Sequence, residues 1–181
     1  MIIQTHKASS YPSTLLENMA IEAARYVDVP LRTRIFFQED SLYGVKQYFI
    51  PCKNEITITV PNPKFASRLP LPWRTYGNLV PPANECHALI DFNLSTRNIG
   101  KHLMSILIHE MQHARDETNG IKFDITPIHR RHLPQALQPD GEQSAIRAEA
   151  KFRKQYRQAP PSVKLVVKQF NEHIRSLRRT A

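Results

Sequence analysis

The sequence predicts an α+β fold in which a small mixed sheet of three to four strands is combined with an N-terminal helix, a central helix and C-terminal helices. Two short segments, 45–50 and 55–60, alternate apolar and polar residues, and longer segments on either side of residues 32–60 repeat apolar residues at helical spacing. With 181 residues, of which 41% are hydrophobic, the chain can bury one sizeable core. We expect a single domain over residues 1–181, with its core over about 13–157 and a basic C-terminal helix over 162–179.

A short tail is expected to precede the first helix, which should run from about Ser13 to Tyr26. Either Ser13 or Thr14 is suited to cap its N-terminus, and Pro30 follows its end. One side of this helix would carry Leu15, Leu16, Met19, Ala23 and Val27.

Three strands are expected next. Residues 32–37 suit a first strand, which the turn-prone residues 39–41 would end. Residues 45–50 and 55–60 alternate apolar and polar side chains around a turn at 51–54, a pattern that favours a β-hairpin.

A long irregular segment should follow, because residues 61–84 contain six prolines and little periodicity. Trp73 and Tyr76 are expected to pack this segment onto the body, although they would also suit a substrate groove. Residues 87–92 are predicted to form another strand, after which Ser95 or Thr96 would cap the central helix.

The central helix carries the most informative motif. His109, Glu110 and His113 occur in the order His-Glu-x-x-His, and neither Pro nor Gly interrupts residues 101–119. Residues four apart share one helix face, so the two imidazoles can bind one metal ion. Glu110 can then take a proton from a metal-bound water. The alternative is a surface helix on which two histidines happen to align.

A helix, a small sheet and then a helix with this motif resemble the zincin metallopeptidases, especially their minimal cytosolic forms. The family pattern favours uncharged residues within and just after the motif; Met111, Gln112 and Ala114 agree with it, and Arg115 departs from it. The resemblance covers roughly residues 98–157 and implies zinc-dependent hydrolysis of peptide bonds. In such enzymes an extended peptide substrate lies beside an edge strand of the sheet. We assign the role of this edge strand to residues 87–92.

Glu142 is the favoured third zinc ligand. It opens a helix behind Asp140, and it shares one stripe with Ala145, Glu149, Phe152 and Tyr156. Burying a carboxylate unpaired would cost several kcal/mol, whereas a cation would supply the partner. The segment 141–150 is similar to the glutamate helix of gluzincins, in the short form found in the ImmA/IrrE-like group. Glu149 is the fallback ligand, or a carboxylate that orients a ligand.

Histidine is the rival for the third ligand. His129 and His132 lie 16 and 19 residues after His113, a spacing similar to that of SprT-like proteases of DNA–protein crosslinks. The glycine usual beside the third histidine there is missing, and both histidines also suit a solvated basic loop. Either of them, or Tyr156, could instead donate a hydrogen bond to the reaction intermediate.

The carboxylate that orients a zinc-bound histidine in larger gluzincins is missing from its usual place. It stands four residues beyond the ligand glutamate, where this chain has Ile146. Asp116 or Glu117, one turn after His113, would be the substitute, although both also suit a solvated helix face.

Charge and cysteine content bear on the partners and the compartment. Residues 1–120 hold 12 Lys and Arg against 11 Asp and Glu, whereas residues 121–181 hold 13 against 5. This basic C-terminal third would suit nucleic acid or an acidic partner, or simply two solvated helices. Cys52 and Cys86 form no Cys-x-x-Cys pair and are expected to be free thiols. No signal-like or membrane-spanning run occurs, so we expect a cytoplasmic protein without membrane contact.

The last helix, over residues 162–179, should bury its apolar face on the same chain. Altogether the sequence predicts a zinc endopeptidase in which His109, His113 and Glu142 hold the metal and Glu110 is the general base. Its substrate would be a cytosolic protein, either free or bound to nucleic acid. The alternative from another class is a nucleic-acid-associated regulatory protein with a structural or vestigial zinc site.

Overall fold

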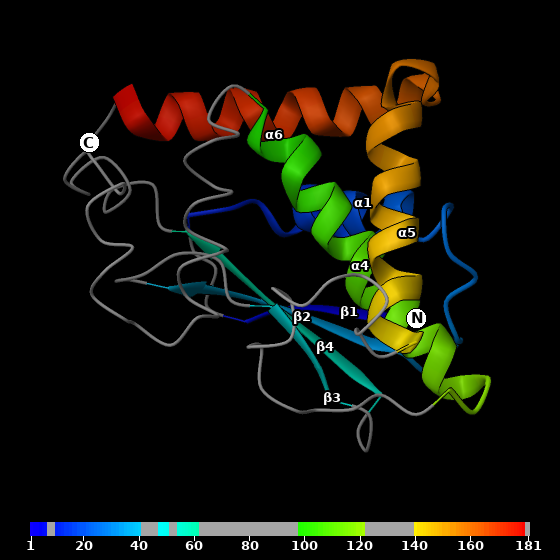
Figure 1. The fold of residues 1–181 in the computed structure, drawn as a ribbon. Coiled ribbons are helices and arrows are strands. Elements are labelled where there is room, and N and C mark those ends of the chain that lie inside the picture. The colour runs from blue at the N-terminus through cyan, green and yellow to red at the C-terminus, as the bar shows by residue number, and fades with distance from the viewer. Residues whose placement is uncertain (7–9, 41–46, 51–53, 62–97, 122–139, 180–181) are drawn as a thin grey trace, which may run out of the picture.

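The computed structural model describes residues 1–6, 10–40, 47–50, 54–61, 98–121 and 140–179, and the fold is that of these residues (Figure 1). They form a mixed α+β structure with a four-stranded sheet, as the sequence predicts. All the helices lie on one side of the sheet. Several sequence predictions concern residues outside this part of the chain: the strand at 87–92, the segment 62–84 with Trp73 and Tyr76, both cysteines, His129 and His132.

The sheet has the order β1-β2-β4-β3. Its strands are β1 (Ile2–His6), β2 (Arg34–Asp40), β3 (Gln47–Ile50) and β4 (Glu55–Pro61). β1, β2 and β4 run parallel, and β3 runs antiparallel to β4. The pairing of β3 with β4 confirms the predicted hairpin.

Two expectations at the start of the chain were wrong. Residues 2–6 form β1 beside β2 and are not a simple tail, because each residue of the segment finds a partner in β2. β2 continues to Asp40, through two of the residues predicted to be its turn. Five residues are too few to show periodicity, so β1 depends on tertiary pairing.

In the part of the chain that the structure describes, four α-helices and one 3₁₀ turn form the second layer. They are α1 (Ser13–Ala23), α4 (Ile99–Thr118), α5 (Asp140–Gln155), η5 (Tyr156–Gln158) and α6 (Pro161–Arg179). α4 contacts β3 and β4, whereas α6 packs on α1 and α4 (Figure 1). α4 therefore contacts the sheet as well as α1, α5 and α6.

The core forms where the sheet meets α4 and α1. Ile35, Ile56 and Ile58 from the strands are fully buried, as are Leu107 and Met111 from α4. Ile3, Ile35 and Ile56 are paired neighbours on three adjacent strands, so they present one apolar row to the helices. Each fully buried side chain of this size contributes about 1.5–3 kcal/mol, so this contact fixes the position of α4 on the sheet.

The helix caps differ from the predicted ones. Pro12 is the N-cap of α1 and makes no side-chain hydrogen bond, so neither Ser13 nor Thr14 is the cap. α4 begins at Ile99, and Asn98 caps it by accepting a hydrogen bond from the Lys101 N–H at 3.2 Å. The expected caps at Ser95 or Thr96 were therefore wrong, because the described helix starts after them.

α6 packs on the same chain, as predicted. Val163, Val166, Val167, Phe170 and Ile174 are buried, and Leu177 is half-buried. Asn171 ties the helix to the start of α4: its Oδ1 accepts from the Gly100 N–H at 2.8 Å, and its Nδ2 donates to Asn98 Oδ1 at 3.0 Å. A Cβ on Gly100 would lie 2.6 Å from the Val167 carbonyl oxygen, so glycine permits this close approach.

Among the described helices, none combines the length and the apolar character needed to cross a membrane.

Candidate metal centre

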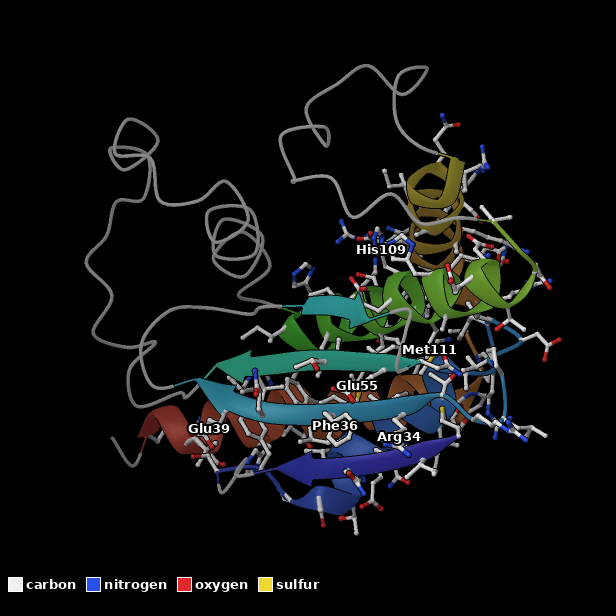
Figure 2. All side chains as sticks on the ribbon, turned by 90° about the horizontal axis from the view of Figure 1, so that it is seen from below. Arg34, Phe36, Glu39, Glu55, His109 and Met111 are labelled. Atoms are coloured by element: carbon white, nitrogen blue, oxygen red, sulfur yellow. The ribbon has the colours of Figure 1, made fainter. Side chains whose placement is uncertain are left out.

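α4 has an apolar face toward the sheet and a buried polar face toward α5. Met111 points to the sheet, whereas His109 lies between α4 and α5 (Figure 2). The helices run antiparallel, since Arg153 contacts Ser105, Glu149 contacts His109, and Ser144 contacts Gln112. A row of buried polar groups between two helices is costly unless each group has a partner. This polar face of α4 is therefore the strongest candidate for a functional site.

The two motif histidines meet at the centre of the polar face. His109 is 3% exposed and His113 is 1% exposed, and their Nε2 atoms are 3.1 Å apart. The rings stand nearly perpendicular, at 82°. The expected juxtaposition of the imidazoles is confirmed.

This separation fits two ligands of one metal ion. A tetrahedral zinc about 2.0–2.1 Å from each nitrogen would hold the two nitrogens about 3.3–3.4 Å apart. The observed 3.1 Å is also a hydrogen-bond distance between a protonated and an unprotonated Nε2. The donor atoms therefore fit a metal, and a shared proton is the alternative.

Glu149 of α5 contacts the opposite edge of the His109 ring. Its Oε2 lies 3.3 Å from His109 Nδ1, so Nδ1 carries the proton and Nε2 keeps its lone pair for a ligand. Burial would raise the pKa of Glu149, but the hydrogen bond to His109 and the positive charges nearby outweigh it. The pKa of Glu149 consequently lies below its ordinary value, and the carboxylate is charged.

Glu142 is placed by its backbone on the same stripe of α5, two turns before Glu149. It lies two residues from Ser144, which contacts Gln112, so it is at the His113 end of the site. Glu149 marks the His109 end. The Glu142 side chain is outside the part that the structure describes, and within the described residues no three His, Cys, Asp or Glu groups gather around one point.

Glu110 is buried beside His109, with 2% of its surface exposed. It lies one residue from His109 and so about 100° around the helix, which gives its carboxylate a different direction from the two imidazoles. A buried carboxylate at this position is available to exchange a proton inside a water-poor site.

Of the two acids after the motif, Asp116 is buried and Glu117 is exposed. The Gln112 side-chain amide donates to Asp116 Oδ1 at 2.7 Å and to Ser144 Oγ at 3.0 Å. Asp116 thus supports the contact of Gln112 with Ser144, which joins α4 to α5 near His113. The described contacts assign the carboxylate beside a motif histidine to Glu149.

Comparison with family models, with curated proteins and with solved structures finds no match for this chain.

Tyr156 does not join the histidines. It belongs to η5, where Lys101 Nζ lies 5.0 Å from the centre of its ring. Lys101 is eight residues before His109, which corresponds to about 12 Å along α4. Burial raises the pKa of Tyr156, although the hydrogen bond with Asn98 opposes this. Its described neighbours include Lys101 and Asn98 at the start of α4 and Phe152 of α5.

Three residues at the site were not predicted from the sequence: His102, Ser105 and Arg153. Arg153 contacts Glu149 at 2.6 Å, Ser105 Oγ at 3.2 Å and His102 Nδ1 at 3.2 Å. The signal was present, because His102, Ser105 and His109 recur at helical spacing and Arg153 is four residues after Glu149. This spacing indicates a shared site only when the packing of α5 against α4 is known.

Proposed function

We propose that this chain is a zinc-dependent endopeptidase. The observation that carries the proposal is the pair of buried Nε2 atoms of His109 and His113, 3.1 Å apart. A buried carboxylate, Glu110, lies between them in the chain. Two converging neutral nitrogens with an adjacent general base are the parts that metal-assisted hydrolysis requires.

His109, His113 and Glu142 would hold the metal. The two imidazoles offer Nε2, and Glu142 is supported by its place on α5 at the His113 end of the histidine pair. Zinc held there would lower the pKa of a water molecule and polarise the scissile carbonyl. Glu149 Oε2 faces Nδ1 of His109 at 3.3 Å, which supports the orienting role for Glu149 and leaves the role of ligand to Glu142.

Glu110 would be the general base and then the general acid. Its carboxylate accepts a proton from the attacking water and passes the proton to the leaving amine. Its burial removes competing water molecules from that transfer. One carboxylate is enough because the two transfers follow each other.

A protein or peptide substrate is supported by the sheet edge next to the site. β3 contacts α4, and among the described strands β4 is its only partner. A strand edge offers main-chain N–H and C=O groups to an extended peptide without fixing its side chains. Residues 87–92, the strand predicted for this role, lie outside the described residues, and β3 would offer a similar edge. We place the enzyme in the cytoplasm.

A deciding experiment compares Glu110→Gln with the unaltered protein. Zinc per chain would be measured by elemental analysis, and hydrolysis would be followed on a denatured, fluorescently labelled protein. We expect Glu110→Gln to keep about one zinc and to lose at least a hundredfold in rate, because the general base is gone.

Glu117→Gln is the matched control, since Glu117 is exposed on the same helix. It should keep both zinc and activity. Undiminished hydrolysis by Glu110→Gln would contradict the mechanism. A wild-type protein that takes up no zinc would leave only a proton shared between two histidines.

Nucleic acid is the second candidate partner, and the surface of α6 favours it. Lys164, Lys168, Arg175 and Arg179 are exposed along one side of the helix, away from its buried valines. Spacings of four and seven residues keep them within one stripe. Such a stripe would suit a phosphate backbone, and it is compatible with a protease whose substrates are bound to nucleic acid.

A further inference from the structure

Arg153 joins the candidate metal centre to the first half of α4. Its Nη2 lies 2.6 Å from Glu149 Oε1 and 3.2 Å from His102 Nδ1, and its Nε donates to Ser105 Oγ at 3.2 Å. The Ser105 hydroxyl in turn donates to the His102 carbonyl oxygen at 2.9 Å. One guanidinium thus contacts two side chains of α4 and one of α5.

The directions of these hydrogen bonds follow from chemistry. Arginine has only donors, so Nδ1 of His102 must be an acceptor and its proton must be on Nε2. Ser105 can accept from Arg153 because its own proton is given to the backbone. The orientation of the guanidinium is therefore fixed by groups that belong to α4, independently of Glu149.

The two oxygens of Glu149 are consequently divided between two partners. Oε1 contacts Arg153, and Oε2 faces His109 Nδ1 at 3.3 Å. Because its guanidinium also bonds to groups of α4, Arg153 restrains the rotation of the Glu149 carboxylate better than a flexible lysine would. This division keeps Glu149 on the Nδ1 edge of His109 and away from the Nε2 atoms.

We propose that Arg153 is a positioning residue that holds Glu149 against His109 and thereby raises the affinity of the site for zinc. The inference rests on the proposed function, because it requires His109 to be a metal ligand. It assigns a task to a residue that touches neither the metal nor the substrate. Without Arg153 the carboxylate can rotate, and the His109 ring loses a fixed partner.

The test measures the zinc dissociation constant by competition with a chromophoric chelator in the full-length protein. Glu149→Gln should weaken zinc binding by roughly 10- to 100-fold, and Arg153→Met by about tenfold. Arg153→Lys should recover part of the loss. Lys154→Met is the matched control, since it removes an exposed charge from the next position of α5 and should leave the constant unchanged.

The double variant Glu149→Gln/Arg153→Met separates positioning from a merely structural role. If Arg153 acts through Glu149, the double variant should bind zinc as Glu149→Gln does, within about twofold, because neighbouring effects are not additive. It also removes both charges together, so it stays informative if Arg153→Met alone fails to fold. Substitution of cobalt for zinc gives a second readout, since its visible spectrum should change in Glu149→Gln and Arg153→Met.

Three outcomes would overturn the inference. In the first, the wild type binds zinc and Arg153→Met binds it equally well, so that the proposed function survives without this role for Arg153. In the second, the losses of the single variants multiply in the double variant, which means that Arg153 does not act through Glu149. In the third, the folded wild type binds no zinc, and the proposed function fails with the inference.

Discussion

His109 is the residue at which the two helices that build the site meet. One edge of its ring faces His113 and the other faces Glu149, so each nitrogen has one defined task. A carboxylate on Nδ1 fixes the tautomer, leaves Nε2 as the electron-pair donor and makes that donor more basic. The buried pair is therefore prepared for a cation by contacts that do not involve the cation.

The third ligand can be identified at the same scale by alanine substitution. We expect Glu142→Ala to lose its bound zinc and Glu149→Ala to bind zinc more weakly. His129→Ala and His132→Ala should keep one equivalent. Zinc per chain, measured by elemental analysis after dialysis against metal-free buffer, would check this.

Loss confined to one of the two histidine variants would contradict the assignment of Glu142. The site would then resemble that of the SprT-like proteases more closely than that of the gluzincins. The exposed Glu117→Ala on α4 is the control, because it removes a carboxylate without touching the buried face.

The sequence alone was sufficient for the motif residues and insufficient for their supports. The spacing of His109 and His113 within one helix predicts their contact, because the geometry is local. The contact of Arg153 with His102 joins residues 51 positions apart and depends on how α5 is rotated against α4. Nothing within either helix specifies that rotation, so a charge pair four residues apart looks like an ordinary surface pair.

Among the elements, α4 is the most constrained, because the sheet, α5 and α6 all pack against it. At Gly100, backbone atoms limit how closely α4 can approach α6. A side chain at position 100 would meet the carbonyl of Val167, which cannot move without shifting α6. The two asparagines, Asn98 and Asn171, hold the helices at this separation.

Gly100→Ala should therefore destabilise the protein, even though alanine favours helices. We expect a loss of about 1–3 kcal/mol in the free energy of unfolding, as for other overpacked contacts. Urea denaturation followed by circular dichroism would measure it. Lys164→Ala, an exposed change one turn from Val167, should stay within about 0.5 kcal/mol of the wild type. An equally stable Gly100→Ala protein would mean that α4 and α6 do not approach so closely.

The elements themselves were predictable where their pattern was long. The helix around the motif and the last helix have repeating apolar residues over many turns, and the hairpin of β3 and β4 follows from alternation on both sides of a short turn. β1 was missed because its stability comes from β2, whose paired residues lie 32 positions later in the chain. The helix caps were missed because the N-cap of α1 is a proline, Pro12, and the N-cap of α4 is Asn98, three residues after Ser95.

For the whole molecule, the charge distribution is the property most open to test. The formal charge is +9, and most of the excess is in the C-terminal third. α6 lies on the outside of the helical layer (Figure 1), so its basic stripe is accessible over the described surface. Lys and Arg side chains on a surface of this kind can neutralise phosphates, which releases the counterions condensed on a nucleic acid.

Binding to a duplex oligonucleotide should therefore weaken steeply as salt rises. Replacing Lys164, Lys168 and Arg175 by Gln should lower the slope of log affinity against log salt by roughly one per residue that contacts a phosphate. Fluorescence anisotropy at several salt concentrations would measure the slope. Arg32→Gln, an exposed charge before β2, is the control and should change it little. No binding at low salt would remove nucleic acid as a partner.

The polar contact between α4 and α5 has a consequence for the order of folding. α5 adds few apolar groups to the core, chiefly Ala145 and Phe152, whereas α4, α1, α6 and the sheet share most of it. Docking of α5 should then come late, after the rest of the core has collapsed. Substitutions in the polar face should mainly speed unfolding and leave the folding rate nearly unchanged. Glu142 and Glu149, which α5 carries, would thus be the last groups to reach the site, on a scaffold that already holds His109, Glu110 and His113.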